Sequence, residues 1–211
     1  MSPVDPADAV GPVDSASPAP CLVLVMVGTD HHPFDRLVEW VDDWADGRPD
    51  DGVRVLLQHG RTRAPRIVPG RDFMPRAELD ALLAEAEVVV SHGGPSTIME
   101  SRRRGVVPIV VARTVKLGEH VDDHQQRFAA AMAARGLIRL AEDRETLHRL
   151  LDEAVAEPML VDEGGEDSDT GESALRLGRL VEELMAGRRP PGSGRPGVRR
   201  RLAGFPRKVA G

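Results

Sequence analysis

The hydrophobic positions of this chain fall into two patterns, and the first is a short, continuous apolar run. Such a run predicts a strand that is buried on both faces, as in a parallel sheet. Runs of this kind cover 21–27, 53–57, 88–90 and 106–111, and shorter ones cover 67–68 and 137–140.

The second pattern repeats every three or four positions and predicts amphipathic helices. This spacing occurs over 34–44, 75–86, 124–135, 143–155 and 174–186. A further helix is expected to begin at Pro95, because proline suits the first helical turn. Strands and helices therefore alternate along the chain, which indicates an α/β fold built on a doubly wound parallel sheet.

The two ends of the chain differ from its middle. Residues 1–20 are rich in Pro, Ala, Ser and Asp and are expected to be disordered. Residues 187–211 contain eight basic residues and no acidic ones, which leaves 20 basic against 34 acidic residues elsewhere. We expect one domain over 21–186, interrupted by an acidic loop at 161–173, and a basic Gly/Pro-rich disordered tail over 187–211. That tail either contacts an anionic lipid surface or stays solvated.

Cysteine content and hydropathy restrict the compartment. The single cysteine, Cys21, rules out an internal disulfide and fits a reducing environment. No apolar run approaches the roughly 20 residues needed to cross a bilayer. Residues 1–20 lack the basic start and apolar middle of a signal peptide. We expect a soluble, cytoplasmic protein with no nucleic-acid partner.

Polar loops follow four of the predicted strands, at 28–33, 58–62, 91–97 and 112–125. The carboxyl ends of parallel strands share one edge of a sheet, where ligands bind in open α/β folds. Four loops at one edge therefore predict a single binding site.

The segment 91–100 reads SHGGPSTIME and resembles an anion-binding turn. Gly93 and Gly94 allow a phosphate to approach the main chain, and the following helix presents N–H groups and a positive dipole end. Ser96 and Thr97 either donate to a phosphate or cap the helix. Glu100 either accepts the two hydroxyls of a ribose or faces solvent. Glycines in such a turn also serve packing, and neither the three-glycine dinucleotide fingerprint nor the P-loop pattern is present.

The segment 118–126 reads GEHVDDHQQ and concentrates acids, amides and imidazoles. His120 and His124 have the i, i+4 spacing of a zinc helix, but Val121 replaces the glutamate which that pattern requires. The same residue types form hydrogen bonds with a polyhydroxylated sugar. Asp122 or Asp123 is also suited to cap the predicted helix at 124–135.

Four motifs in order resemble the C-terminal domain of glycosyltransferase family 28. They are V-x-V-G-T…P-F-D-R-L at 25–37, S-H-G-G-P-x-T-I-x-E at 91–100, P-I-V-V-x-R at 108–113 and G-E-H-V-D-D-H-Q at 118–125. The chain most resembles the short bacterial exopolysaccharide subunits, which are related to the catalytic subunit of the dolichol-linked N-acetylglucosamine transferase. The resemblance covers about residues 21–155.

This resemblance implies the Rossmann-like, donor-binding half of a GT-B enzyme that takes a UDP-sugar and inverts the anomeric carbon, with no metal or cofactor. The implied donor-binding residues are Gly28, Thr29, His92, Gly93, Gly94, Ser96, Thr97, Glu100, Arg113, His120, Asp123, His124 and Gln125. Relatives of this type obtain the acceptor half from a membrane-associated subunit. The resemblance therefore implies such a partner, a lipid-linked saccharide acceptor and a peripheral location at the inner membrane face.

Ser96 departs from the family pattern, which has glycine there. The extra Cβ either crowds a phosphate or brings a hydroxyl that binds it. Two other functions remain open from the sequence, a non-catalytic nucleotide-sugar-binding subunit and a UDP-sugar epimerase. The catalytic base is not assigned; His31, His32 and His120 are the local candidates.

Overall fold

The computed structural model describes residues 20–48 and 52–158, together with 178–179 and 182. Within these ranges six strands form one parallel sheet in the order β3-β2-β1-β4-β5-β6. The strands are β1 (Cys21–Met26), β2 (Val53–Gln58), β3 (Gly70–Arg71), β4 (Val88–Ser91), β5 (Ile109–Val110) and β6 (Arg139–Leu140). The order reverses between β1 and β4, which is where doubly wound sheets open a binding crevice. The predicted fold class is confirmed.

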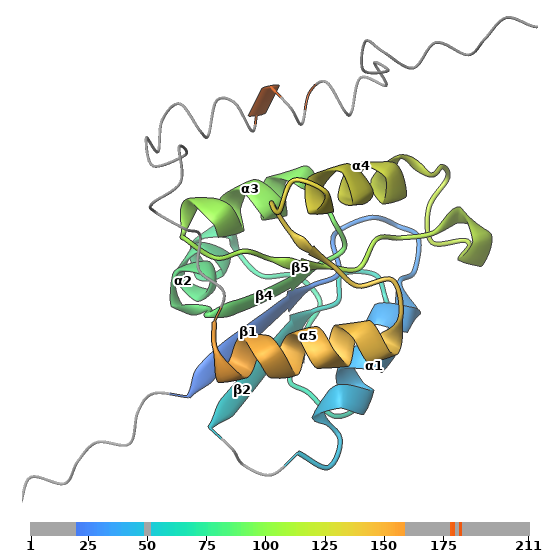
Figure 1. Cartoon of the computed structure of the whole chain (residues 1–211). Coiled ribbons are helices and arrows are strands. Elements are labelled where there is room, and N and C mark those ends of the chain that lie inside the picture. Colours follow the sequence, from blue (N-terminus) through green and yellow to red (C-terminus); the bar gives the residue numbers. More distant parts are fainter. Residues whose placement is uncertain (1–19, 49–51, 159–177, 180–181, 183–211) are drawn as a thin grey trace, which may run out of the picture.

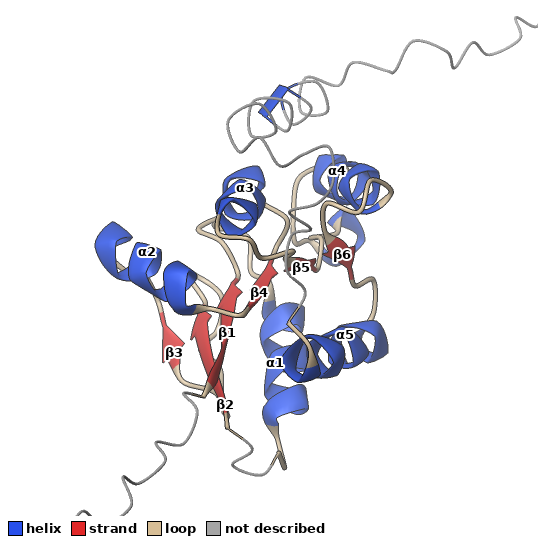
Figure 2. Cartoon of the chain, turned by 60° about the vertical axis from the view of Figure 1, so that its left-hand side comes forward, coloured by secondary structure: helices blue, strands red, loops and turns tan. Residues whose placement is uncertain are grey.

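Helices cover both faces of the sheet (Figures 1 and 2). One face carries α1 (Asp35–Ala45) and α5 (Arg144–Ala156), and the other carries α2 (Arg76–Glu85), α3 (Pro95–Arg103) and α4 (His124–Ala133). A short 3-10 turn, η1 (Val115–Leu117), lies in the loop before α4. No helix among the described residues is long and apolar enough to cross a membrane.

The central strand β1 shows why its sequence is continuously apolar. Val23 and Val25 pack in the core under α1 and α5, while Leu22 and Leu24 pack in the core under α2. These four side chains have no exposed surface. Alternate residues of a strand point to opposite faces, so a strand covered on both sides is apolar at every position.

The prediction of a strand at 67–68 is wrong, because the backbone N–H groups of this segment donate to a buried carboxylate. Asp42 on α1 is 1% exposed and accepts from the N–H groups of Arg66, Ile67 and Val68 at 2.8, 3.0 and 3.3 Å. The chain reaches the sheet two residues later, at β3. The strands predicted at 106–111 and 137–140 are also shorter, at 109–110 and 139–140.

Several predictions concern residues outside the described ranges. The disordered segment predicted at 1–20 (apart from residue 20), the acidic loop at 161–173 and the tail at 187–211 all lie there. Of the helix predicted over 174–186, only residues 178, 179 and 182 are described, and they are helical.

Candidate functional site

The candidate site lies where β1 and β4 end side by side. Ser91 is the register partner of Met26, and the N–H of His92 donates to the carbonyl of Met26 at 3.2 Å. The loops that follow the two strands, 27–33 and 92–94, therefore leave the sheet next to each other. The structure brings the predicted residues Gly28 and Thr29 to the start of the glycine turn.

The imidazole of His92 lies between two glycines. A Cβ atom on Gly28 would stand 2.8 Å from His92 Cε1, and one on Gly94 would stand 2.6 Å from His92 Nε2. Gly28 also has a φ of +92°, which favours glycine. The close approach of this ring thus requires glycine at both positions. Gly94 therefore serves the packing of His92, whether or not it also contacts a ligand.

His92 is held neutral at physiological pH. Burial, together with the positive charge of Arg113, lowers the pKa of His92 to about 4 from an ordinary value of 6.5. Its Nδ1 lies 3.4 Å from the Met26 carbonyl. A neutral ring can both donate and accept a hydrogen bond.

The N-terminus of α3, the candidate anion-binding seat, has no side-chain cap. Gly94 is the N-cap residue and Pro95 occupies the first helical position, so no side chain caps this end. The N–H groups of Thr97 and Ile98 turn back to the Gly94 carbonyl at 3.1 and 3.2 Å. Within the described part of the chain, the N–H groups of Gly94 and Ser96 have no acceptor. Uncapped N–H groups and the dipole of the helix favour an anion here.

Glu100 lies one turn further along α3 and is held by three arginines. Its carboxylate is 2.9 Å from Arg104, 3.7 Å from Arg103 and 3.8 Å from Arg76 of α2. The side chain is 20% exposed, so it still reaches solvent. A ribose hydroxyl would have to bind this carboxylate in competition with the arginines.

The resemblance implies that Arg113 contacts the donor. In the structure its side chain is fully buried beneath the loops. Its guanidinium donates to the carbonyls of His32 at 2.6 Å, Glu119 at 3.1 Å and Val27 at 3.0 Å. It also lies 4.9 Å from the centre of the Phe34 ring. Burial lowers the pKa of Arg113, and the acids Asp30 and Glu119 oppose that shift. Arg113 therefore fixes the positions of the ligand-facing loops and does not reach the site surface.

The loop 118–125 is anchored through Glu119, which sequence reasoning did not select. Arg36 of α1 forms a two-pronged ion pair with this carboxylate at 2.9 and 2.8 Å, and the N–H of Thr114 donates to it at 2.9 Å. Arg36 also stacks over the ring of Trp40 at 4.6 Å. The P-F-D-R-L motif contained this arginine, but its partner lies 83 residues away and is not visible from the sequence.

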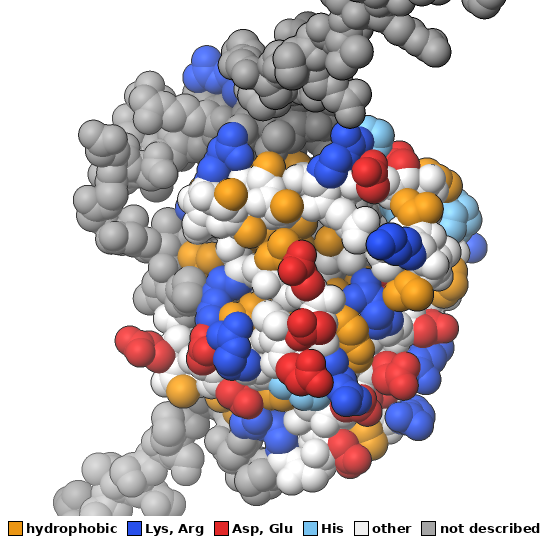
Figure 3. Space-filling model, turned by 45° about the vertical axis from the view of Figure 1, so that its right-hand side comes forward, with side chains coloured by type: hydrophobic (Ala, Val, Ile, Leu, Met, Phe, Trp, Pro, Cys, Tyr) orange, Lys and Arg blue, Asp and Glu red, His pale blue; other side chains and the backbone are white. Residues whose placement is uncertain are grey.

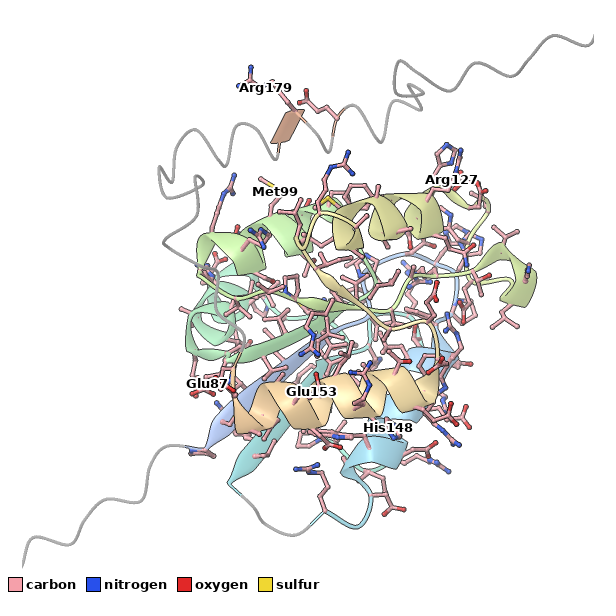
Figure 4. All side chains as sticks on the ribbon, in the orientation of Figure 1. Glu87, Met99, Arg127, His148, Glu153 and Arg179 are labelled. Atoms are coloured by element: carbon pink, nitrogen blue, oxygen red, sulfur yellow. The ribbon has the colours of Figure 1, made fainter. Side chains whose placement is uncertain are left out.

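The predicted sugar-binding residues lie at the start of α4. His124 is the first residue of this helix, and Asp123 precedes it as the N-cap without a side-chain capping bond. Asp123 pairs with Arg127 at 3.1 Å, and Arg127 points away from the sheet on the outer side of α4 (Figure 4). Gln125 keeps its Oε1 buried without a partner among the described residues. His120 lies closer to the β1 loop, with its Nε2 4.0 Å from Asp30.

Asp30 is a further polar residue of the site that the sequence did not single out. Partial burial raises the pKa of Asp30, but hydrogen bonds from the N–H and ring of His32, with the charge of Arg113, outweigh it and lower the pKa to about 2. Asp30 is therefore an anion at neutral pH. The sequence could have indicated Asp30 as a site residue, because it directly follows Thr29 in a loop at the carboxyl end of a predicted strand.

Comparison with known proteins assigns the family. Residues 22–168 match the model of the glycosyltransferase family 28 C-terminal domain. The chain belongs to this family. Its parallel sheet with helices on both faces is the Rossmann-like half-domain of the GT-B type.

Two relatives match most of this chain, and both are longer proteins. A tylactone mycaminosyltransferase of Streptomyces fradiae is 32% identical over 148 residues, which are 62% of this chain and 31% of that protein. The crystal structure of the glycotransferase of kitacinnamycin superposes with a TM-score of 0.51 at 22% identity, over 87% of this chain and 44% of that one. The chain thus spans less than half the length of these two relatives.

Proposed function

We propose that this chain is the donor-binding subunit of an inverting, UDP-sugar-dependent glycosyltransferase. The observation that carries the proposal is the uncapped N-terminus of α3, which presents the N–H groups of Gly94 and Ser96 at the β1–β4 crevice. Family membership makes a nucleotide-sugar the expected occupant of that crevice.

The residues around the seat have complementary tasks in this proposal. The α3 N-terminus and the Gly28–Thr29 turn bind the diphosphate and offset the charge that develops on the leaving nucleotide. Glu100 binds the ribose, with Arg104 holding its carboxylate in place. Asp123, His124 and Gln125 bind the donor sugar, and the buried Oε1 of Gln125 lacks a protein partner among the described residues. The proposed transfer needs no bound metal, because the N–H groups at the start of α3 offset the charge on the leaving nucleotide.

Calorimetric titration of UDP and of UDP-sugars into the full chain tests the donor site. We expect saturable UDP binding that Glu100→Gln weakens about tenfold, since an acceptor to two hydroxyls loses its charge. Glu145→Gln is the matched control, because Glu145 is an exposed acid in the first turn of α5 on the opposite face of the sheet. Absence of UDP binding, or equal effects of the two variants, would overturn the donor site.

We further propose that a membrane-associated partner supplies the acceptor half and a lipid-linked saccharide as substrate. The support is the resemblance of the motifs at 25–37, 91–100, 108–113 and 118–125 to those of short subunits that act with such a partner, together with the family match over residues 22–168. Product should form from a polyprenyl-diphosphate saccharide only when membranes from the producing cell are added, and Glu100→Gln should lower its rate of formation at limiting donor. Transfer by the chain alone would refute the partner while leaving the donor site standing. UDP binding without transfer under any condition would favour a non-catalytic subunit.

A further inference from the structure

A row of histidine and aspartate side chains joins the β1 loop to the loop before α4. Asp30 Oδ1 lies 3.3 Å from Nδ1 of His31 and 2.7 Å from Nδ1 of His32. The other carboxylate oxygen lies 4.0 Å from Nε2 of His120. Of these residues the family resemblance implies only His120 for donor binding, and the function proposed above gives no task to Asp30, His31 or His32. Figure 3 shows exposed histidine side chains at the upper right-hand side of the molecule.

We propose that Asp30, His31 and His32 form a binding site for a divalent transition-metal ion, with His120 as a fourth ligand. Imidazole nitrogen and carboxylate oxygen together suit Zn²⁺ and its neighbours Ni²⁺ and Cu²⁺ more than Mg²⁺ or Ca²⁺, which prefer oxygen alone. The ion is not a participant in the sugar transfer proposed above, and its binding is tested without any nucleotide.

The ligand atoms already converge. One atom from each of Asp30, His31 and His32 lies within 4.8 Å of the other two. Bonds of 2.0–2.1 Å to a tetrahedral ion separate neighbouring ligand atoms by about 3.3 Å. The His31–Asp30 separation of 3.3 Å has this value, and His32 needs to move by about half an ångström from its hydrogen bond. His31 is 76% exposed, so its ring is free to turn toward the ion.

Hydrogen bonds hold the backbone of the loop that carries these ligands. The N–H of His32 donates to Asp30 Oδ1 at 2.8 Å, and Arg113 donates to the carbonyl of His32 at 2.6 Å. Arg113 is itself fully buried. Groups that hold the ligand backbone in place reduce the ordering cost of metal binding, as outer-shell contacts do in established sites.

His120 has its Nε2 toward Asp30 and its Nδ1 toward Asp122, and the histidines outside the proposed site have other partners. The pair that the sequence suggested for zinc, His120 and His124, faces Asp122 at 3.4 and 2.9 Å. Within the described residues, only the group of Asp30, His31 and His32 brings three ligand atoms together. The rings of His59 and His148 bond backbone carbonyls, and His148 lies on α5 across the sheet (Figure 4).

Titration of ZnCl2 into the full-length, tag-free and chelator-treated protein tests the site by calorimetry. We expect one Zn²⁺ per chain. Asp30→Asn, His31→Ala and His32→Ala should each weaken binding by about tenfold or more, and His120→Ala by a smaller factor. His124→Ala is the matched control and should change the affinity by less than about twofold, because its imidazole lies in the neighbouring Asp122 group.

Folding is checked by circular dichroism and metal-free thermal unfolding, and the exposed His31 provides the variant that least disturbs the loop. No saturable Zn²⁺ binding would overturn the proposal. Equal loss in His31→Ala and His124→Ala would also overturn it, because the ion would then lie at Asp122. Retained affinity in folded Asp30→Asn would do the same. None of these results depends on UDP binding, so the donor site and the metal site succeed or fail separately.

Discussion

The imidazole of His92 occupies the space that a side chain on Gly94 would need, with Nε2 only 2.6 Å from the position of a Cβ atom there. Gly94 has a φ of −63°, which any residue adopts, so the ring and not the backbone conformation demands glycine. The N-cap residue of α3 is therefore linked to the residue that directly follows β4.

Replacement of Gly94 by alanine should destabilise the protein by about 1–3 kcal/mol, because the added methyl group overpacks the ring. UDP affinity should fall with it, since the N-terminus of α3 must shift. Urea unfolding and calorimetry measure the two effects. In a His92→Ala background the same substitution should cost much less. Equal costs in both backgrounds would show that the contact is not the cause.

The ion pair between Arg36 and Glu119 should be the strongest polar contact of the site. Glu119 is 6% exposed at its side chain, and Arg36→Met would leave that carboxylate without its charged partner. We expect a loss of about 3–5 kcal/mol in urea unfolding. Arg127→Met is the matched control, because Arg127 and its partner Asp123 are 62% and 61% exposed, and should cost less than about 1 kcal/mol. Similar losses in both would contradict the anchoring role of Glu119.

Acid should destabilise the protein through His92. Burial, with the charge of Arg113, lowers the pKa of His92 to about 4 from 6.5. Between these values the unfolded chain binds a proton that the folded chain does not, so stability falls as pH drops from 6.5 to 4. Urea unfolding across this range should show a shallower pH dependence for His92→Asn than for the natural chain. Parallel curves would exclude His92 as the source.

Asp42 should matter for stability although it is remote from the ligand-facing loops. Asp42→Ala removes the acceptor for three backbone N–H groups, and we expect a loss of about 2–4 kcal/mol, since the buried N–H of Val68 and the part-buried N–H groups of Arg66 and Ile67 lose their partner. Limited proteolysis should then cut near residues 66–68. Asp43→Ala is the control, because Asp43 makes one exposed contact with Arg144 at 3.2 Å. A stable, uncut Asp42→Ala protein would contradict this account.

Ser96 should contribute a hydroxyl to the diphosphate. Its side chain is exposed at the second position of α3, beside the N–H groups of the anion-binding seat. Ser96→Ala and Ser96→Gly should both weaken UDP binding by about 3- to 10-fold, the value of one net hydrogen bond. Tighter binding by Ser96→Gly, measured by calorimetry, would instead show that the Cβ atom crowds the phosphate.

The architecture could be predicted from the sequence, because burial of a strand on both faces leaves a local hydrophobic pattern. The apolar run at 21–27 predicted β1, and the spacing over 143–155 predicted α5. The strand at 67–68 failed for a non-local reason: the carboxylate of Asp42, some 25 residues earlier, holds the N–H groups that a strand would use. Such competition leaves no trace in a window of ten residues.

For the site, the sequence determined which loops meet, since parallel strands end at one edge and the motifs lie in the loops after them. The contacts of each side chain in those loops could be seen only in the folded structure. Arg113 turned inward to the carbonyls of His32 and Val27, and Glu119 paired with Arg36. The position of a loop follows from the hydrophobic periodicity of the strands and helices around it. The directions of the Arg113 and Glu119 side chains instead depend on hydrogen-bond partners more than 80 residues away, which only folding brings close.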